Sequence, residues 1–280
     1  MLNLVDKLIL LYELLLTVHV LLFKTNIPDW GGHIQLNIFI IGWIFFSAWT
    51  ANRFNRQPFK FIHTFYPLFL LIWHYPQACE LRYSVITSSL DHILIPLDLA
   101  IFRVALYDII PRNLNLLSLE IFHFFYFCYY LSLGVPAWIV YKKRDPQISA
   151  YLFVIMVTNI IHQWFVIFFP ADGPVPLRPD IMPDGVLMIP IMNLIYQLDA
   201  GGGAFPSLHV AGAVITGMYA YKFLPQWKWL WIFTFCAITA ATFVCSYHYP
   251  IDSLIGAITG WFCYIYIPRI HDYLLFSIHI

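Results

Sequence analysis

Charged side chains are scarce in this chain of 280 residues. Only 11% of the residues are Asp, Glu, Lys or Arg, whereas 61% are hydrophobic and the mean hydropathy is +0.73. Soluble domains carry about 25% charged residues, so this composition excludes a soluble globular protein. The basic and acidic residues cancel to a formal net charge of zero. Because nucleic-acid-binding proteins carry an excess of positive charge, we expect no nucleic-acid partner.

Cysteines are also few, and none of the five forms a CxxC pair. Most of them lie in apolar runs, so we expect buried free thiols in helices. A disulfide between Cys79 and Cys245, which fall on the same predicted membrane face, is the alternative. The first apolar run contains Asp6, Lys7 and Glu13 and no small-residue cleavage site. We therefore expect no cleavable signal peptide.

Long apolar segments are abundant. A bilayer core of about 30 Å requires about 20 helical residues to cross it, and eight segments approach this length. The pattern predicts an all-α polytopic membrane protein with about eight transmembrane helices, forming a single membrane domain over 1–280. The Trp, Tyr and Phe residues suit interfacial belts and lipid-facing surfaces. The predicted spans are 4–23, 34–51, 61–78, 116–141, 148–169, 205–223, 229–247 and 251–267.

Lysines and arginines predict the orientation of these spans. When the loops alternate from a cytoplasmic N-terminus, the cytoplasmic side receives twice as many Lys and Arg residues as the opposite side. This bias has the direction that the positive-inside rule requires. The even number of spans then places both termini in the cytoplasm.

Two loops on the predicted non-cytoplasmic face are long. Residues 79–115 alternate apolar and acidic positions, which favours an interfacial or re-entrant helix. Residues 170–204 begin with prolines that prevent a long helix. A short amphipathic helix is predicted over 186–198, followed by Gly201–Gly203. Because glycine permits sharp turns and close approach of a ligand, Gly203 is a candidate substrate-binding residue.

A histidine and a carboxylate stand at the start of the last span, in the run from His248 to Asp252. Pro250 favours a helix that begins there, which puts Asp252 in its first turn. We expect the carboxylate to accept a hydrogen bond from Nδ1–H of His248 and leave a lone pair on Nε2. Such an imidazole can act as a nucleophile toward phosphorus. The alternative is a helix-capping aspartate beside an interfacial histidine.

A second histidine, His209, follows the glycines in the run Phe205-Pro206-Ser207-Leu208-His209. Ser207 is expected near the cap of a helix whose free N–H groups suit a phosphate, so we count it as substrate-binding. His209 can then protonate a departing oxygen as a general acid. Read alone, it could also be an ordinary histidine near a helix end. These residues offer few ligands for a closed metal site, and we expect no metal and no other cofactor.

Together the two runs resemble the membrane branch of the type 2 phosphatidic acid phosphatase superfamily, which has Pro-Ser-x-His followed by His-x3-Asp. Leu208, where phosphatases commonly carry Gly, is closer to the inositol phosphorylceramide synthase-like branch. The resemblance covers about 115–270 and implies a catalytic six-helix core with a metal-independent reaction on the non-cytoplasmic face. It implies that His248 is the nucleophile, Asp252 its orienting partner and His209 the proton donor.

The chain departs from the phosphatase pattern at two cationic positions. Ala241 and Thr242 stand where phosphatases carry Ser-Arg, and Ala171 replaces a Lys in the first motif. Since the synthase branch also lacks that arginine, the departures favour transfer over hydrolysis, although they also fit an inactive relative. Arg178, whose planar fork matches phosphate oxygens, is the best remaining phosphate ligand. A solvated loop arginine is the alternative.

The sequence thus predicts an integral membrane lipid phosphotransferase that works through a phosphohistidine intermediate. Its partners would be membrane lipids, with a phospholipid as donor and a lipid or an alcohol as acceptor. A lipid phosphate or diphosphate phosphatase is the runner-up, and a catalytically inactive transporter or scaffold is the alternative of another class. Residues 1–78 form N-terminal helices to which the resemblance assigns no role.

Overall fold

The regular elements are all helices in the computed structural model, which describes residues 2–198 and 201–278. Eight of them are long, one at each predicted span. The long helices are α1 (Leu4–Leu22), α2 (Trp30–Phe54), α3 (Gln57–Leu81), α6 (Leu116–Lys142), α7 (Gln147–Phe168), α10 (Leu208–Phe223), α11 (Lys228–Val244) and α12 (Pro250–Ile278). The short helices are α4 (Asp91–Phe102), α5 (Leu106–Asn113), α8 (Arg178–Ile181) and α9 (Met188–Leu198), with 3-10 turns at Lys24–Asn26, Val175–Leu177 and Pro225–Trp227.

The helix ends differ from the predicted spans. The prediction ended the last span at 267, whereas α12 continues to Ile278 with Pro268 inside it. A proline removes one backbone hydrogen bond and does not always end a helix, and membrane-crossing length sets no limit on helix length. The helix expected from 205 begins only at Leu208, because Ser207 has extended backbone and acts as its N-cap.

Five helices within the described residues are long and apolar enough to cross a membrane, namely α2, α6, α7, α11 with its preceding turn, and α12. Such a set indicates an integral membrane protein. Of the other predicted spans, α1 carries Asp6, Lys7 and Glu13, and α10 has only 16 residues. The total of eight crossings therefore remains a prediction, as does the orientation.

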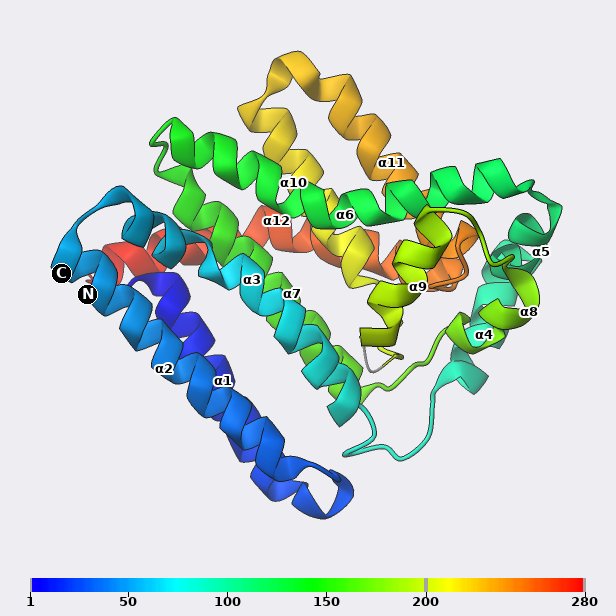
Figure 1. Cartoon of the computed structure of the whole chain (residues 1–280), viewed down its shortest axis with the longest axis horizontal. Helices are drawn as coiled ribbons and strands as arrows, with labels where there is room; N and C mark the ends of the chain where they lie inside the picture. The colour runs from blue at the N-terminus through cyan, green and yellow to red at the C-terminus, as the bar shows by residue number, and fades with distance from the viewer. Residues whose placement is uncertain (1, 199–200, 279–280) are drawn as a thin grey trace.

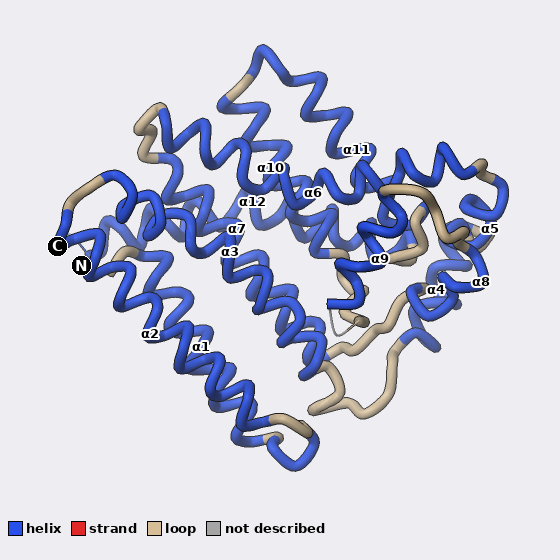
Figure 2. The backbone as a smooth tube through the Cα atoms, in the orientation of Figure 1, coloured by secondary structure: helices blue, strands red, loops and turns tan. Residues whose placement is uncertain are grey.

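Both termini lie together at one end of the bundle, near the α2–α3 and α6–α7 connections (Figures 1 and 2). Helix α10 contacts α6, α7, α11 and α12, which surround it. Helices α1 to α3 join this group through α7, and the short helices α4 and α5 pack on α12 and α11. In Figure 1 the short helices gather at the opposite end of the molecule from the termini.

Two glycines bring α10 and α12 unusually close together. Gly256 and Gly260 are one turn apart on α12 and face the start of α10. A Cβ atom would lie 2.4 Å from the Ser207 carbonyl oxygen at Gly256 and 2.6 Å from that of Ala211 at Gly260. Small residues at this spacing allow two helix backbones to approach in membranes. These two glycines therefore allow the beginning of α10 to pack directly on the first turns of α12.

Buried hydrogen-bonded pairs connect α1 to α3 and to the segment just after it. Ionisable groups in a membrane protein are costly unless they find partners, and Asp6, Glu13 and His19 of α1 do. Tyr66 donates to Asp6 at 2.6 Å, Glu13 Oε1 lies 2.7 Å from His74 Nε2, and His19 Nε2 lies 2.8 Å from Ser84 Oγ. The charges in the first helix are therefore structural, since they hold the first and third helices in register.

The five cysteines are free thiols. Cys79, Cys245 and Cys263 are buried as expected, whereas Cys128 is half-buried and Cys236 is exposed. The alternative disulfide between Cys79 and Cys245 is absent. Cys79 packs in an apolar cluster with α1 and α7, whereas Cys245 packs in a different cluster with Tyr126 and Tyr247.

Candidate active site

The side chains of His209 and His248, the two histidines of the predicted site, lie close together. The ring centroids of His209 and His248 lie 5.6 Å apart with an interplanar angle of 61°. His209 comes from the first turn of α10, and His248 from the connection between α11 and α12. Both side chains are buried, and neither Nε2 atom has a hydrogen-bond partner within the described part of the chain. Because buried polar atoms are normally satisfied, the two Nε2 atoms mark a place for a polar ligand.

The Nδ1 atom of His248 is held by a backbone group. It lies 2.8 Å from the carbonyl oxygen of Ala204, which can only accept a hydrogen bond. The proton is therefore on Nδ1, and the lone pair is on Nε2. Asp252 Oδ2 is 3.8 Å from Nδ1, beyond hydrogen-bond distance, and accepts from the backbone N–H of Tyr249 at 2.8 Å. The expected hydrogen bond to Asp252 is thus replaced by one to Ala204, while the carboxylate stays close enough to stabilise a positive ring.

His209 is the second residue of α10. Ser207 caps this helix by accepting from the N–H of Val210, and its own N–H donates to the carbonyl oxygen of Asp252 at 3.0 Å. Nδ1 of His209 lies 3.2 Å from the hydroxyl of Tyr126 on α6. The ring packs between those of Tyr126 and Tyr129, at centroid distances of 4.6 and 4.5 Å. Ser207 therefore links the two motifs, and α6 orients the second histidine.

This pair of motifs lies inside a recognised family profile. The profile described as the PAP2 superfamily matches residues 116–266, which is more than half of the chain. This chain belongs to the PAP2 superfamily. No curated protein matches it, and no solved structure does.

The match confirms the superfamily that the two motifs indicated, and it leaves the synthase-like branch undistinguished. Membership indicates an enzyme of the phosphatase or phosphotransferase type that acts on lipids. The matched region runs from the start of α6 into α12 and contains His209, His248 and Asp252. Helices α1 to α3 precede it and are therefore an addition to the PAP2 region of this chain.

Arg178 contacts a histidine outside the predicted pair, because its Nη2 atom lies 3.3 Å from Nε2 of His123. Its guanidinium is buried and donates to the Cys245 carbonyl oxygen and to Asn193 Oδ1, the latter at 3.1 Å. The guanidinium carbon also lies 3.9 Å from the ring centroid of Tyr247. The contacts that link Arg178 to His209 run through the rings of Tyr247 and Tyr126. These contacts hold the guanidinium in place beside the tyrosines that surround His209, and its binding of a phosphate stays a prediction.

The turn formed by Gly201–Gly203 packs against the end of α3. Gly202 and Gly203 have φ of +75° and +71°, which favour glycine. Tyr75 donates to the Gly202 carbonyl oxygen at 3.1 Å, and a Cβ atom on Gly203 would lie 2.9 Å from Cys79 Sγ. Gly203 thus allows close approach of α3, and its contact with a substrate stays a prediction. Since Ala204 follows directly, α3 also positions the carbonyl group that bonds His248.

Asp98 is a site residue that sequence reasoning missed. It lies on α4, is buried, and accepts from the backbone N–H of Ile251 at 2.8 Å. Burial raises the pKa of the Asp98 carboxyl, and this hydrogen bond opposes the shift. A carboxylate at this place satisfies a free N–H in the first turn of α12, next to Asp252. No local pattern near Asp98 could reveal a partner 153 positions away.

A large apolar cavity reaches His209. It has a volume of about 980 Å³ and lies between α3 and α6. Aliphatic and aromatic side chains form most of its wall, with His209, Gln77, Glu80 and Asn159 as polar or charged members. Its lining includes Leu36, Phe65, Leu68, Phe69, Ile72 and Tyr75 on one side, and Phe127, Tyr129, Tyr130, Leu133, Gly134 and Trp138 on the other.

The described residues contain no group of three or more His, Cys, Asp or Glu side chains that could hold a metal ion.

Proposed function

We propose that this protein is a lipid phosphotransferase that moves a phospho-headgroup between lipids through a phosphohistidine on His248. The observation that carries the proposal is the pair of buried imidazoles 5.6 Å apart, each with an unpartnered Nε2 atom. The Ala204 carbonyl fixes the nucleophilic tautomer of His248. Nucleophilic catalysis by an oriented imidazole divides one difficult transfer into two easier steps.

The first step forms the phosphoenzyme. Nε2 of His248 attacks the phosphorus of the donor lipid, and a P–N bond forms as the P–O bond to the leaving alcohol breaks. His209, as an imidazolium, gives its Nε2 proton to the departing oxygen and becomes neutral. The imidazole ring of His248 becomes positively charged, and the carboxylate of Asp252, 3.8 Å from Nδ1, stabilises that charge.

The second step regenerates the enzyme. His209, now neutral, accepts the proton of an acceptor hydroxyl, whose oxygen attacks the phosphorus. The P–N bond breaks, and His248 recovers its lone pair on Nε2. The acceptor leaves with the phospho-headgroup, and both histidines return to their starting protonation states.

The cavity between α3 and α6 supports a lipid as the substrate. A volume of about 980 Å³ with an apolar wall suits a long hydrocarbon chain, and His209 lies in its lining. A lipid held there would place its polar end at the imidazole pair and its chain between the helices. Small water-soluble phosphates would leave this apolar surface unfilled.

Transfer is favoured over hydrolysis by position 242, where phosphatases of the superfamily carry arginine. Thr242 is buried, and its hydroxyl lies 2.7 Å from that of Ser253. The chain thus supplies no cation there to receive a free phosphate group. The distribution of Lys and Arg residues supports an active site on the non-cytoplasmic face with both termini in the cytoplasm.

Purified protein and a phospholipid labelled in its headgroup phosphate test the proposal. The lipid is supplied in vesicles with ceramide, with diacylglycerol, or with neither acceptor. We expect label in a new lipid only when an acceptor is present, and none with His248→Ala. Release of water-soluble label regardless of acceptor, as free phosphate or as the phospho-headgroup, would mean hydrolysis and would favour the phosphatase. Unchanged lipid turnover in His248→Ala would instead support the inactive transporter or scaffold.

A further inference from the structure

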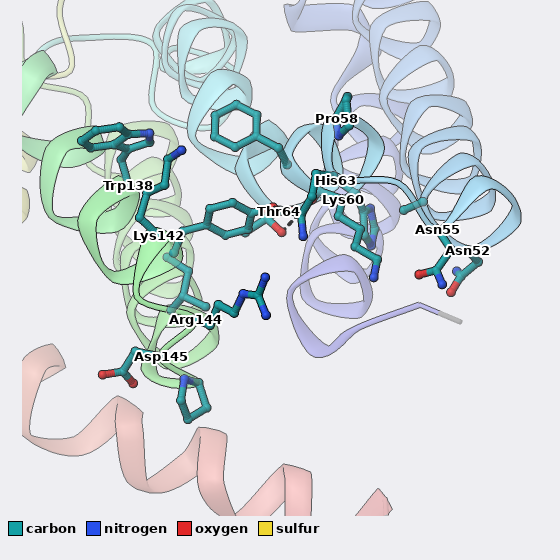
Figure 3. A pocket seen from close by; sticks show the side chains of 16 residues that line it. Asn52, Asn55, Pro58, Lys60, His63, Thr64, Trp138, Lys142, Arg144 and Asp145 are labelled. Atoms are coloured by element: carbon teal, nitrogen blue, oxygen red, sulfur yellow. Dashed lines mark hydrogen bonds between the residues drawn. The ribbon is translucent and has the colours of Figure 1, made fainter.

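A second cavity lies at the far end of α3 and α6 from the histidine pair. It has a volume of about 1140 Å³ and forms where the α2–α3 connection meets the α6–α7 connection (Figure 3). Along α3, Lys60 in this cavity is 15 residues from Tyr75, which lines the first cavity. At 1.5 Å per helical residue Lys60 and Tyr75 are about 22 Å apart, so the charged part of this cavity lies far from the histidine pair, although the two cavities share Trp138.

Three cations line this cavity without a carboxylate partner. Lys60, Lys142 and Arg144 form no ion pair within the residues that the structure describes. Figure 3 shows Lys142 and Arg144 on one side of the cavity and Lys60 on the other. Asp145 also lines the cavity and accepts from the backbone and side chain of Gln147, so one carboxylate stands against three cations. The remaining local charge is therefore positive.

Backbone polarity adds to this charge. Helix α3 begins at Gln57 inside the cavity, and no side chain caps its first turn. Tyr141 donates to Gln57 Oε1 at 3.1 Å, which holds the end of α6 beside this helix start. Free N–H groups and the positive end of the helix dipole favour an anion. These backbone groups add to the attraction for an anion, whereas the preference for negative charge comes from the three cations.

The same cavity has an apolar side. Phe61 and Trp138 line it and expose 37% and 50% of their surface, respectively. Trp138 also lines the apolar cavity that leads to His209, so hydrocarbon surface continues from one cavity toward the other. A ligand that satisfies both sides must carry a negative headgroup and an apolar chain.

We propose that this cavity binds an anionic phospholipid, with its headgroup phosphate between Lys60 and Arg144 and a chain along Phe61 and Trp138. Basic pockets between membrane helices bind such headgroups by charge attraction. The lipid would lie in the leaflet opposite the histidine pair, and it would be a bound partner that is not consumed. The site does not depend on the proposed phosphotransfer, because none of its residues belongs to the catalytic group.

The test measures lipid retention by the full chain. Purified protein in a neutral detergent is titrated with phosphatidylglycerol or phosphatidylcholine, and retained lipid is counted by native mass spectrometry. We expect preferential retention of phosphatidylglycerol and at least a tenfold loss of its affinity in Lys60→Gln/Arg144→Gln. The matched control Lys222→Gln/Lys228→Gln removes two exposed cations, one in the last turn of α10 and one at the start of α11, and should bind as the wild type does.

Three results would overturn the proposal. Equal retention of phosphatidylcholine would remove the preference for an anionic lipid, and equal loss in the control variant would reduce the effect to net charge. Displacement of phosphatidylglycerol by an equal concentration of glycerol 3-phosphate would show that a water-soluble phosphate suffices. Since Lys60 and Arg144 are exposed, an unchanged melting temperature should accompany the loss of binding.

Discussion

At His248, the ring proton and the developing positive charge are handled by two different groups. The Ala204 carbonyl holds the proton on Nδ1, and the Asp252 carboxylate stands 3.8 Å away. A backbone carbonyl fixes the tautomer but adds no formal charge. Asp252 supplies that charge, and its position is fixed by the N–H of Tyr249. The two roles can therefore be separated by mutation.

The substitution Asp252→Asn removes the charge and keeps the shape. The amide oxygen can still accept from Tyr249, and the Ala204 carbonyl still orients the imidazole. We expect kcat to fall on the order of 100-fold, which corresponds to a barrier increase of about 2.7 kcal/mol for the loss of the charge beside the phosphorylated imidazole. Steady-state turnover of a labelled lipid measures the effect. A loss as complete as that of His248→Ala would mean that Asp252, and not Ala204, fixes the tautomer.

At the scale of elements, the site depends on how closely α12 approaches α10. The start of α10 carries Ser207 and His209, and the first turn of α12 carries Asp252. Because Gly256 touches the Ser207 carbonyl, any side chain there must push the two helices apart. The distance between the imidazoles is therefore a consequence of helix packing as much as of the motifs themselves.

Gly256→Ala tests this packing. Its Cβ would lie 2.4 Å from a backbone oxygen, and overpacking of this kind costs about 1–3 kcal/mol. We expect a lower melting temperature and a large loss of lipid turnover. Gly217→Ala on α10 is the matched control, since its nearest contact would be an ordinary 3.6 Å from Phe235. If Gly256→Ala were as stable and as active as Gly217→Ala, the close approach would have no role in the site.

Gly134 on α6 offers a second element-scale test, this time of the cavity. It lines the cavity between α3 and α6, and a Cβ added to it would meet nothing within 4 Å. Gly134→Leu should fill this space without straining the helix. We expect kcat/KM to fall about tenfold for a long-chain lipid relative to a short-chain one, since a few buried methylenes are each worth about 0.8 kcal/mol.

Gly42→Leu is the matched control for that experiment. Gly42 is an exposed position of α2 with nothing within 4 Å of an added Cβ, and it does not line the cavity. Chain-length preference should be unchanged in this variant. An unchanged preference in Gly134→Leu as well would contradict a lipid chain between α3 and α6 while leaving the histidine chemistry intact.

At the scale of the whole molecule, the sequence predicted the eight long helices and the meeting of His209 and His248. Apolar runs and the motifs around the two histidines are local signals, and they sufficed for these features. The Ala204 carbonyl could not be predicted, because a backbone oxygen has no sequence signature. The burial of Arg178 depends on Tyr247 and on the Cys245 carbonyl, which only the folded chain brings together.

The N-terminal helices illustrate the same limit. Glu13 and His19 look anomalous in an apolar run, and their partners on and just after α3 appear only in the fold. Through Tyr75, α3 holds the glycine turn that precedes Ala204. A region outside the PAP2 match thus contributes to the orientation of His248.

Trapping the phosphoenzyme tests the central claim most directly. Protein is mixed with a lipid labelled in its phosphate, quenched under alkaline denaturing conditions within one turnover, and digested for mass spectrometry. The account predicts an acid-labile phosphate on the peptide that contains His248, and none in His248→Ala. Label on a different residue, or turnover by the wild type without any labelled protein at the earliest times, would contradict a phosphohistidine at this position.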